Sequence, residues 1–522
     1  MSAMTGSRRG QAFVERSIGR LFDALTDPAR RERAMPATLL GYVALWTLYG
    51  TLAKGSQDIH SDMSEQFALS RELAWGFSKH PPLAMVVVRA WFAVFPTADW
   101  AYYLLAMATA GLALWIIWRL SARFLDAEKR VLGLALLTLV PFFNFHALKF
   151  NQNTVLMPLW AAATLWFLRS FETRRMPDAA MAGLCAAACM YGKYWSIFLL
   201  LGLGLAALLD ARRAAYFRSA APWVTIAVGV LALAPHVWWL FANDFAPFSY
   251  AVAVHGEATF ATTLRAALGY LAGSLAYVAV PLVISCVAAR PSRAALLEMA
   301  WPVGPDRRLA AAAFWATLLL PAVIAPFFGL QLVSLWSMSA WTLLPMMLLS
   351  SPLVAVGRRD ATRVLALAVV LPIVMVAIAP AIAFATHRGG LPADATHSSL
   401  VVAPIDELWR ETTDRPLKLF AGFDDFPDGV SFYAPSHPFA THVLGGTLAP
   451  AIEERIGREG IALLCPERPR EPAGAARCLD AATSLAVRFP GGKRKEVEVA
   501  RRYLGVAGAP ARYLLITIPP KQ

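Results

Sequence analysis

Ser56-Gln-Asp-Ile-His-Ser-Asp-Met-Ser-Glu-Gln-Phe-Ala-Leu-Ser-Arg-Glu-Leu-Ala-Trp-Gly-Phe-Ser-Lys-His-Pro-Pro-Leu83 is a polar segment that lies directly between two hydrophobic segments of the chain. Ionisable side chains are concentrated in it, at Asp58, His60, Asp62, Glu65, Glu72, Lys79 and His80. Charged groups beside membrane-spanning segments are costly and tend to mark functional sites. We therefore expect this loop to carry chemistry on a membrane-bound substrate, with the rest of the chain as its scaffold.

The composition of the chain indicates an integral membrane protein. Of its 522 residues, 57% are hydrophobic and only 16% are charged, and the mean hydropathy is +0.50, which is far too apolar for a soluble protein. The net charge of +13 comes from short arginine clusters between apolar runs, as the positive-inside rule expects of cytoplasmic loops. We interpret this charge as membrane topology and expect no nucleic-acid partner.

Apolar runs of about 17 to 25 residues predict the membrane spans. They lie near residues 36–53, 99–118, 131–148, 153–169, 178–192, 194–209, 221–241, 264–289, 309–329, 335–356 and 363–385. The run 81–95 is short, and a full crossing there would invert every later loop, so we expect it to lie shallow or re-enter. The prediction is a polytopic α-helical membrane protein with about 11–13 transmembrane helices.

The charges also divide the chain into parts. Residues 1–34 predict a cytoplasmic basic amphipathic helix on the inner leaflet. Its apolar face would consist of Val14, Ile18, Leu21, Phe22 and Leu25. Residues 35–387 form the predicted transmembrane domain, whose first loop, 54–82, opens to the outer face together with the C-terminal segment 388–522.

The C-terminal segment is predicted to fold as a small α/β domain. β-Branched or aromatic runs favour strands at residues 417–423, 430–433, 461–464 and 513–518, and residues 449–456 have a helical pattern. Cys465 and Cys478 are candidates for a disulfide in an oxidising compartment. The remaining cysteines, Cys185, Cys189 and Cys286, fall in apolar spans and are expected to be core residues.

Ser61-Asp-Met-Ser-Glu65 has the pattern of a helix start. Ser61 or Asp62 can cap a helix that runs to about Trp75, and Asp62 with Glu65 makes a capping box. Capping and catalysis are compatible, because a capping carboxylate lies at the open end of the helix.

Polar side chains also mark other connections that are predicted to lie on the same side. They are Lys149, Asn151 and Asn153 before one span, Lys193 between two spans, and His236, Asn243 and Asp244 among aromatic residues. Charged groups at membrane depth cost about 2.5–3.5 kcal/mol each and tend to face a cavity. Lys193 has the alternative of snorkelling to the headgroups.

A cavity with carboxylates at one end and Lys, His and Asn around it suits group transfer from a lipid-linked phosphate. An aspartate would accept the proton of the attacking hydroxyl, and the cations would take up charge on the departing phosphate. The sequence has no Gly-rich nucleotide-binding loop, so a soluble nucleotide-sugar donor is not indicated. No cofactor is certain, although Asp58, His60 and Asp62 could hold a divalent cation.

Several motifs resemble those of a known family. Gly76-Phe-Ser-Lys-His-Pro-Pro-Leu83 follows an outer loop with Asp and then Glu, and Gly192-Lys-Tyr, His236-Val-Trp-Trp and Trp336-Ser-Met-Ser-Ala-Trp-Thr-Leu-Leu-Pro345 follow later. This order resembles the GT-C glycosyltransferases of the protein O-mannosyltransferase and lipid A aminoarabinose-transferase type. The likeness is greatest to bacterial members that modify lipopolysaccharide, such as the rhizobial galacturonosyltransferases.

The resemblance implies a polyprenyl-phosphate-sugar donor, an active site at the periplasmic face of a bacterial inner membrane and an essential aspartate at Asp62. Many relatives have Asp-Glu consecutively, whereas here Met63 follows Asp62 and the acid is Glu65. Lys79 stands where relatives are often acidic, and Asn153 where many have Asp. His80 falls where the aminoarabinose transferases place a phosphate-binding lysine.

From residues and resemblance together, we expect a glycosyltransferase that moves one sugar to a lipid or glycan of the cell envelope. The expected catalytic residues are Asp62 as base and Glu65 as supporting acid. The expected substrate contacts are Lys79, His80, Lys149, Asn153, Lys193, Tyr194, His236 and Trp341. The alternatives are a protein O-mannosyltransferase and, from another class, a lipid or sugar transporter or flippase.

Overall fold

The computed structural model describes residues 15–256, 259–390, 397–423, 425–443, 450–467, 472–489 and 491–521. By its internal contacts the chain forms two units. The first comprises Met1–Thr47, Ala74–Ala84 and Leu104–Val374, and the second comprises Leu48–Leu73, Met85–Tyr103 and Met375–Gln522. Four helices contribute residues to both units, namely α2 (Arg31–Ala53), α4 (Leu83–Phe92), α5 (Asp99–Ser121) and α17 (Arg358–Gly389).

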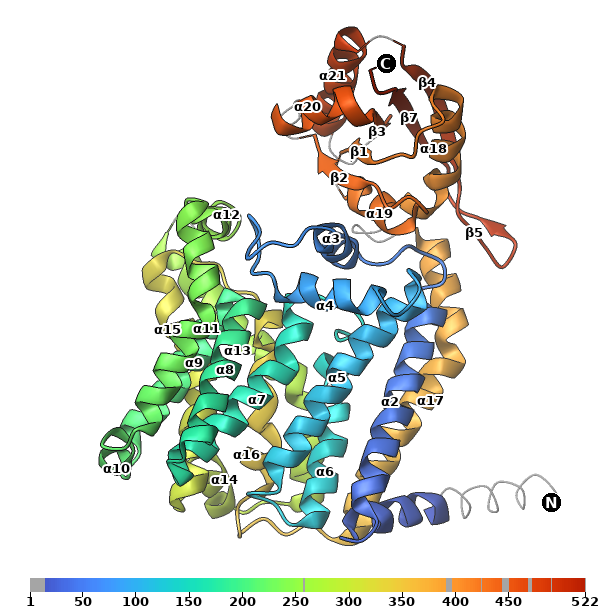
Figure 1. The fold of residues 1–522 in the computed structure, drawn as a ribbon. Helices are drawn as coiled ribbons and strands as arrows, with labels where there is room; N and C mark the ends of the chain where they lie inside the picture. The colour runs from blue at the N-terminus through green and yellow to red at the C-terminus, as the bar shows by residue number, and fades with distance from the viewer. Residues whose placement is uncertain are drawn as a thin grey trace, which may run out of the picture. The chain divides into compact units, whose positions relative to one another are not determined.

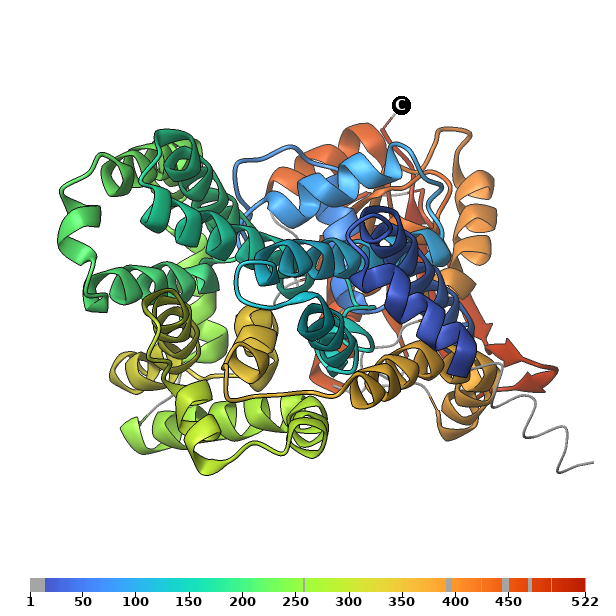
Figure 2. The ribbon, with the colours of Figure 1, turned by 90° about the horizontal axis from the view of Figure 1, so that it is seen from below.

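The first unit is helical (Figures 1 and 2). After residues 15–26 and α2 it contains α6 (Ala127–Thr138), η1 (Pro141–Phe143), α7 (Gln152–Thr173), α8 (Met176–Gly192), η2 (Tyr194–Ser196), α9 (Ile197–Leu209), α10 (Arg213–Phe217), α11 (Ala221–Ala242), α12 (Ala246–His255), α13 (Phe260–Ala289), α14 (Arg293–Ala300), α15 (Pro305–Phe328), η3 (Ser334–Leu343) and α16 (Leu344–Leu349). The pairs α7 with α8, α8 with α11, and α9 with α15 pack most extensively.

Within the described residues, six helices are long and apolar enough to cross a membrane, namely α5, α7, α11, α13, α15 and α17. Only 11% of the most apolar window of α11 and 22% of that of α13 is buried. A helix that exposes so much apolar surface is expected to face lipid. The predicted polytopic helical fold is thus confirmed, although these six helices are fewer than the roughly 11–13 transmembrane helices predicted.

Two predicted spans are interrupted by turns or coil. The range 131–148 contains the end of α6, the short η1 and turns, and the range 335–356 contains η3 and α16 followed by coil. Pro141 and Pro345 lie near these changes of conformation, where proline removes a backbone donor. By contrast, α4 (Leu83–Phe92) has only 10 residues, about 15 Å of helix, and is too short to cross, in line with the prediction for 81–95.

The N-terminal helix, residues 15–26, buries part of its predicted apolar face. Ile18, Phe22 and Leu25 are buried within the protein, and Asp23 forms an ion pair with Arg358 of α17. Part of the predicted apolar face therefore packs against the protein, and the position of this helix on the inner leaflet stays a prediction. The predicted face residue Val14 lies outside the described residues.

The second unit contains α3 (Ser61–Ser70) and α4 together with a C-terminal α/β domain. That domain consists of α18 (Ser398–Thr412), β1 (Leu419–Gly422), α19 (Phe426–Tyr433), β2 (Phe439–His442), α20 (Pro450–Glu459), β3 (Ile461–Pro466), α21 (Pro472–Arg488), β4 (Lys493–Val499), β5 (Arg502–Tyr503), β6 (Val506–Ala507) and β7 (Ala511–Ile518). The five-stranded sheet has the order β2-β1-β3-β7-β4. β1 pairs in parallel with β2 and β3, whereas β7 is antiparallel to β3 and β4.

Alternating side chains of β3 enter two different cores. Leu463 and Cys465 pack in one core, with residues of α20 and α21, and Ala462 and Leu464 pack in the other, with residues of α18 and α19. This alternation is the period of a β-strand buried on both faces. The predicted disulfide is also confirmed, because Cys465 of β3 is bonded to Cys478 of α21.

The strand predictions at 417–423, 461–464 and 513–518 are confirmed, whereas the one at 430–433 is wrong. Those residues form the last turn of the helix α19, which has Pro427 in its first turn. A four-residue apolar run fits a strand and a buried helix equally well. The predicted helix at 449–456 is present as α20, although Ala449 itself lies outside the described residues.

Candidate functional site

Lys193 is the centre of a polar cluster in the first unit. It follows α8 directly, and its Nζ donates a hydrogen bond of 2.8 Å to Oδ1 of Asn153. The same amine lies 4.7 Å from the ring centroid of Trp336, within cation–π range. Asn153 is available for this contact because Asn151, and not Asn153, caps α7. The amine is thus held in one place by a neutral amide and an aromatic face.

Tyr194 and His236 extend this cluster. The Tyr194 hydroxyl and Nε2 of His236 are 3.0 Å apart, and Nδ1 of His236 is 2.5 Å from the carbonyl oxygen of Trp75. Since that carbonyl can only accept, Nδ1 carries the proton, and Nε2 of the neutral ring accepts from Tyr194. His236 thereby anchors the segment 74–84 to α11.

Gly76 adds a second contact between the segment 74–84 and α11. A Cβ at position 76 would come within 2.3 Å of the Trp239 ring, so only glycine allows the backbone to pack against that indole. A turn follows, in which the Phe77 amide donates to the carbonyl of His80 at 3.0 Å. Lys79 lies on this turn, with its Nζ 5.5 Å from the centroid of Tyr250.

The other predicted contacts are placed as follows. Lys149 precedes α7, and its carbonyl accepts a hydrogen bond from Thr154 at 2.7 Å. Trp341 is buried in η3, where its indole donates to Ser337 at 3.3 Å and its ring contacts Phe314. The structure therefore brings Asn153, Lys193, Tyr194 and His236 together, but no described contact joins Trp341 to them.

Sequence reasoning missed two aromatic neighbours of Lys193. Trp336 supplies the cation–π face, and the ring of His255, at the end of α12, lies 5.1 Å from that indole. Burial and the charge of Lys193 lower the pKa of His255. The only sequence signal for Trp336 was the motif that contains it. That motif also contains Trp341, and the sequence does not show which of the two tryptophans lies beside Lys193.

In the second unit, α3 presents two carboxylates on one face. Its buried residues are Met63, Ser64, Gln66, Phe67, Ala68 and Ser70. Asp62 and Glu65 are three positions apart on the partly exposed side, so they are neighbours on the helix surface. The side chain of Asp62 is 37% exposed. Both residues are thus partly exposed.

The cap of α3 differs from the prediction. The N-cap is His60, whose Nδ1 accepts a hydrogen bond of 3.1 Å from the backbone N–H of Asp62. Neither Ser61 nor Asp62 caps the helix, and α3 ends at Ser70 and not near Trp75. An imidazole nitrogen has replaced the expected carboxylate in this role, and Oδ1 of Asp62 lies 3.6 Å from that nitrogen.

Aromatic packing fixes α3 within the second unit. The ring of Phe67 contacts Phe92 of α4 and Phe432 of α19, with centroids 5.4 and 5.1 Å away. The hydroxyl of Tyr102 donates to the carbonyl of Met63 at 2.7 Å. Hydrophobic contacts and one backbone hydrogen bond thus hold the helix from the side opposite Asp62 and Glu65.

Glu65 also lies near a histidine–aspartate pair. Nε2 of His442 is 3.2 Å from Oδ2 of Asp428, and Glu65 is close enough to interact with His442 electrostatically. Burial lowers the pKa of His442, but the hydrogen bond to Asp428 and its charge outweigh burial, and the net shift is upward. The second unit therefore places a histidine with a raised pKa near Glu65.

Asp58 has a structural role that the sequence did not reveal. Its carboxylate accepts hydrogen bonds from the backbone N–H of Ser399 at 3.1 Å and from the Ser399 hydroxyl at 2.5 Å, and it forms an ion pair with Arg501. These contacts tie the loop 54–60 to the C-terminal domain. The considered cation site at Asp58, His60 and Asp62 is not formed, since no group of three such side chains among the described residues could hold a metal.

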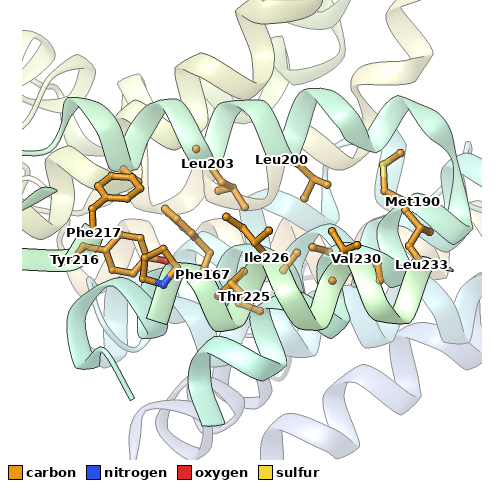
Figure 3. Close-up of a pocket in the computed structure, with 18 residues that line it drawn as sticks. Phe167, Met190, Leu200, Leu203, Tyr216, Phe217, Thr225, Ile226, Val230 and Leu233 are labelled. Atoms are coloured by element: carbon orange, nitrogen blue, oxygen red, sulfur yellow. The ribbon is translucent and has the colours of Figure 1, made fainter. Parts of the chain in front are cut away.

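An apolar groove of about 360 Å³ begins near the Lys193 cluster and runs along α8, α9 and α11 (Figure 3). Tyr216 and Phe217 lie at one end, and Met190 and Leu233 lie at the other. Met190 precedes Lys193 by three residues and Leu233 precedes His236 by three, so each is one helical turn away. This end of the groove therefore lies near the Lys193 cluster.

Comparisons with known proteins agree with this architecture. Residues 79–239 match the family model described as Dolichyl-phosphate-mannose-protein mannosyltransferase. A search of curated protein sequences finds no match to the chain. The fold is the GT-C fold that the sequence predicts.

Two solved structures carry the fold comparison. The chain is similar to ArnT from Cupriavidus metallidurans bound to undecaprenyl phosphate, with a TM-score of 0.58 and 11% identity over 92% of this chain and 97% of that one. For ArnT in the apo state the TM-score is 0.55, with 10% identity over 92% and 98% of the two chains. At such low identity, the likeness shows the fold alone.

Proposed function

We propose that this protein is a glycosyltransferase of the bacterial inner membrane. It transfers one sugar from a polyprenyl-phosphate donor to a hydroxyl group of a lipid or glycan of the cell envelope, of the lipopolysaccharide or lipid A type. Its N-terminus is cytoplasmic, and its first polar loop and C-terminal domain are periplasmic. The observation that carries the proposal is the amine of Lys193, held between Asn153 and Trp336 at the head of an apolar groove.

In the proposed reaction the acceptor oxygen attacks the anomeric carbon of the donor sugar. The bond from that carbon to the phosphate oxygen breaks, and polyprenyl phosphate leaves with the bonding electron pair. Asp62 takes the proton of the attacking hydroxyl, a general-base step that contributes about 10²–10⁴-fold in rate. Glu65 supports Asp62 by raising the negative potential on their shared helix face.

The departing phosphate gains negative charge, which cations must stabilise. We assign this role to Lys193, with Lys79, His80 and Lys149 as further phosphate contacts. Asn153 positions the Lys193 amine, and the Tyr194 oxygen, held in place by His236, can accept a hydrogen bond from a sugar hydroxyl. A lysine suits this task as a compact charge with three donors. Trp341 is proposed only as a packing residue of η3.

The groove along α8, α9 and α11 supports a lipid-linked donor. Its lining is apolar, and the hydroxyl of Thr225 is already used, since it donates to the carbonyl of Ala179 at 3.0 Å. A water-soluble donor would gain nothing from such a surface. An isoprenoid tail gains about 25 cal/mol for each Å² of apolar area that it buries.

The direct test is transfer by purified protein. We expect release of undecaprenyl phosphate from an undecaprenyl-phosphate sugar in the presence of envelope lipids, and a matching loss of one sugar from the envelope lipids of a deletion strain, both measured by mass spectrometry. Unchanged envelope lipids together with no turnover of any polyprenyl-linked sugar would refute the proposal. Labelling of a cysteine at position 62 only from the cytoplasmic side would refute the proposed topology.

The family-model match supports a second candidate, a protein acceptor, because the matched family is described as a protein mannosyltransferase. The deletion strain separates the two candidates. Missing hexose on periplasmic proteins with intact envelope lipids would favour the protein acceptor, and the opposite pattern would favour the lipid or glycan acceptor.

A further inference from the structure

A second apolar groove lies in the first unit, lined by other helices. Its volume is about 420 Å³, and its walls come from residues 15–26, α2, α6 and α17. Three hydroxyls line it, and each already donates to a backbone carbonyl: Thr38 to Ala34, Thr138 to Ala135 and Tyr42 to Phe143. The groove therefore presents a hydrocarbon surface to whatever enters it.

Arginines surround one end of this groove. Arg31 lies one helical turn before the lining residue Ala34, and Arg130 directly precedes the lining residue Val131. Glu32 is shared, with its carboxylate oxygens 3.6 Å from Nε of Arg31 and 3.9 Å from Nη1 of Arg119. Arg130 interacts electrostatically with all three of these groups. Three guanidinium groups thus face one carboxylate.

Two of these arginines have buried donors that make no hydrogen bond, and in Arg31 that donor has only the longer ion pair with Glu32. The side-chain Nε atoms of Arg31 and Arg130 are buried and have no hydrogen-bond partner within the described part of the chain. Arg130 as a whole is only 8% exposed. Its guanidinium stacks on Trp118 at 3.9 Å and donates to the Trp118 carbonyl at 2.9 Å, which fixes its position. Buried donors are costly to leave unpaired, so an acceptor from outside the chain is expected.

We propose that this groove binds one anionic glycerophospholipid. An acyl chain lies between α2, α6 and α17, and the phosphate accepts hydrogen bonds from Arg31, Arg119 and Arg130. The excess of positive charge favours an anionic headgroup over a zwitterionic one, whose ammonium the arginines would repel. This lipid is neither donor nor acceptor of the proposed transfer, so the site stands independently of the proposed function.

Native mass spectrometry of the whole protein tests the headgroup preference. The detergent-solubilised protein is titrated with phosphatidylglycerol or with phosphatidylcholine of the same acyl chains, and we expect tighter first-lipid binding for phosphatidylglycerol. At about 1 kcal/mol for each arginine, the double variant Arg31→Gln, Arg119→Gln should bind phosphatidylglycerol roughly 30-fold more weakly. Arg293→Gln, at an exposed arginine of α14, is the matched control and should bind like the wild type.

A second variant tests the groove itself. Gly41 of α2 lines it, and a Cβ there would meet nothing within 4 Å, so Gly41→Leu fills the groove without disturbing its walls. We expect Gly41→Leu to weaken binding of both lipids, whereas Gly269→Leu, at an equally open glycine of α13, should not. Equal binding of the two lipids by the wild type overturns the proposal. So does undiminished phosphatidylglycerol binding by either the double arginine variant or Gly41→Leu.

Discussion

The Lys193 cluster and the acidic face of α3 carry charges of opposite sign and differ in how far those charges are enclosed. Polar and aromatic contacts surround the Lys193 amine, which is fixed by Asn153 and Trp336. By contrast, α3 is held by rings on its buried side, and Asp62 and Glu65 lie on its partly exposed side. An amine held in place suits the binding of a fixed anion, whereas an accessible carboxylate suits the exchange of protons with a substrate. We therefore assign binding of the donor phosphate to the first region and chemistry to the second.

The largest expected effect is at Asp62. Asp62→Asn keeps the size of the side chain but removes the base, so transfer should fall by about 10²–10⁴-fold while the affinity for undecaprenyl phosphate stays unchanged. Single-turnover rates and lipid binding by native mass spectrometry measure the two quantities separately. Asp480→Asn, at an exposed aspartate of α21, is the matched control and should behave like the wild type. A variant at Asp62 that retains transfer would mean that the base lies elsewhere.

Lys193 should show the reverse pattern. Lys193→Ala removes a charge-assisted hydrogen bond worth about 1.5–3 kcal/mol, which corresponds to roughly 10- to 150-fold weaker binding of undecaprenyl phosphate. Lys418→Ala, at an exposed lysine before β1, should leave that affinity alone. If Lys193→Ala bound undecaprenyl phosphate normally, the amine would have a structural role, and the contrast between the two regions would be lost.

The apolar groove below Lys193 should matter only for long donors. Gly204 lines that groove, and a Cβ there would meet nothing within 4 Å. Gly204→Leu should weaken binding of undecaprenyl phosphate by about tenfold, because each buried CH₂ contributes about 0.8 kcal/mol. A short-chain polyprenyl phosphate should bind this variant and the control Gly269→Leu alike. Equal loss for short and long chains would mean that the variant disturbs the head site and not a tail site.

The smallest expected effects concern two histidines of the second unit. Burial, together with the charge of Arg501, lowers the pKa of His397 below 6.5, so protonation of the unfolded chain should cost stability as pH falls below that value. The pKa of His442 is raised by Asp428, so its contribution is complete below 6.5 and is lost as pH rises through the folded-state pKa.

Thermal unfolding between about pH 5 and 8 separates these two histidines. We expect His397→Gln to reduce the loss of Tm on acidification and His442→Gln to reduce the loss of Tm above neutral pH. Identical pH profiles for the two variants would show that neither ring titrates with the expected sign. Since His442 lies beside Glu65, its variant also reports on the acidic face of α3.

From the sequence, the fold could be predicted more accurately than the side-chain contacts of the site. Hydropathy, the arginine clusters and the first-loop motif are local or compositional signals, and they gave the helical scaffold, the α/β domain and the GT-C resemblance. The strand prediction for residues 430–433 was wrong because so short an apolar segment does not show whether its period is that of a strand or of a helix. The prediction of the α3 cap was wrong because several consecutive polar residues can cap a helix. The choice of His60 depends on backbone geometry.

The cluster around Lys193 depends on pairings that spacing cannot reveal. Asn153 and Lys193 are 40 residues apart in the chain. Trp336 and Trp341 belong to one motif, but in the 3₁₀ helix η3 they face different surroundings, Trp336 toward Lys193 and Trp341 toward Phe314. A 3₁₀ helix has three residues per turn, so different positions share a face than in an α-helix. Sequence periodicity alone does not predict where such a helix forms.

The most direct measurement is an experimental structure of the protein with undecaprenyl phosphate bound. The account predicts that a phosphate oxygen lies within about 3.2 Å of Nζ of Lys193, with the isoprenoid chain along α8, α9 and α11. A phosphate bound elsewhere, with the Lys193 amine still in contact with Asn153 and Trp336, would contradict it.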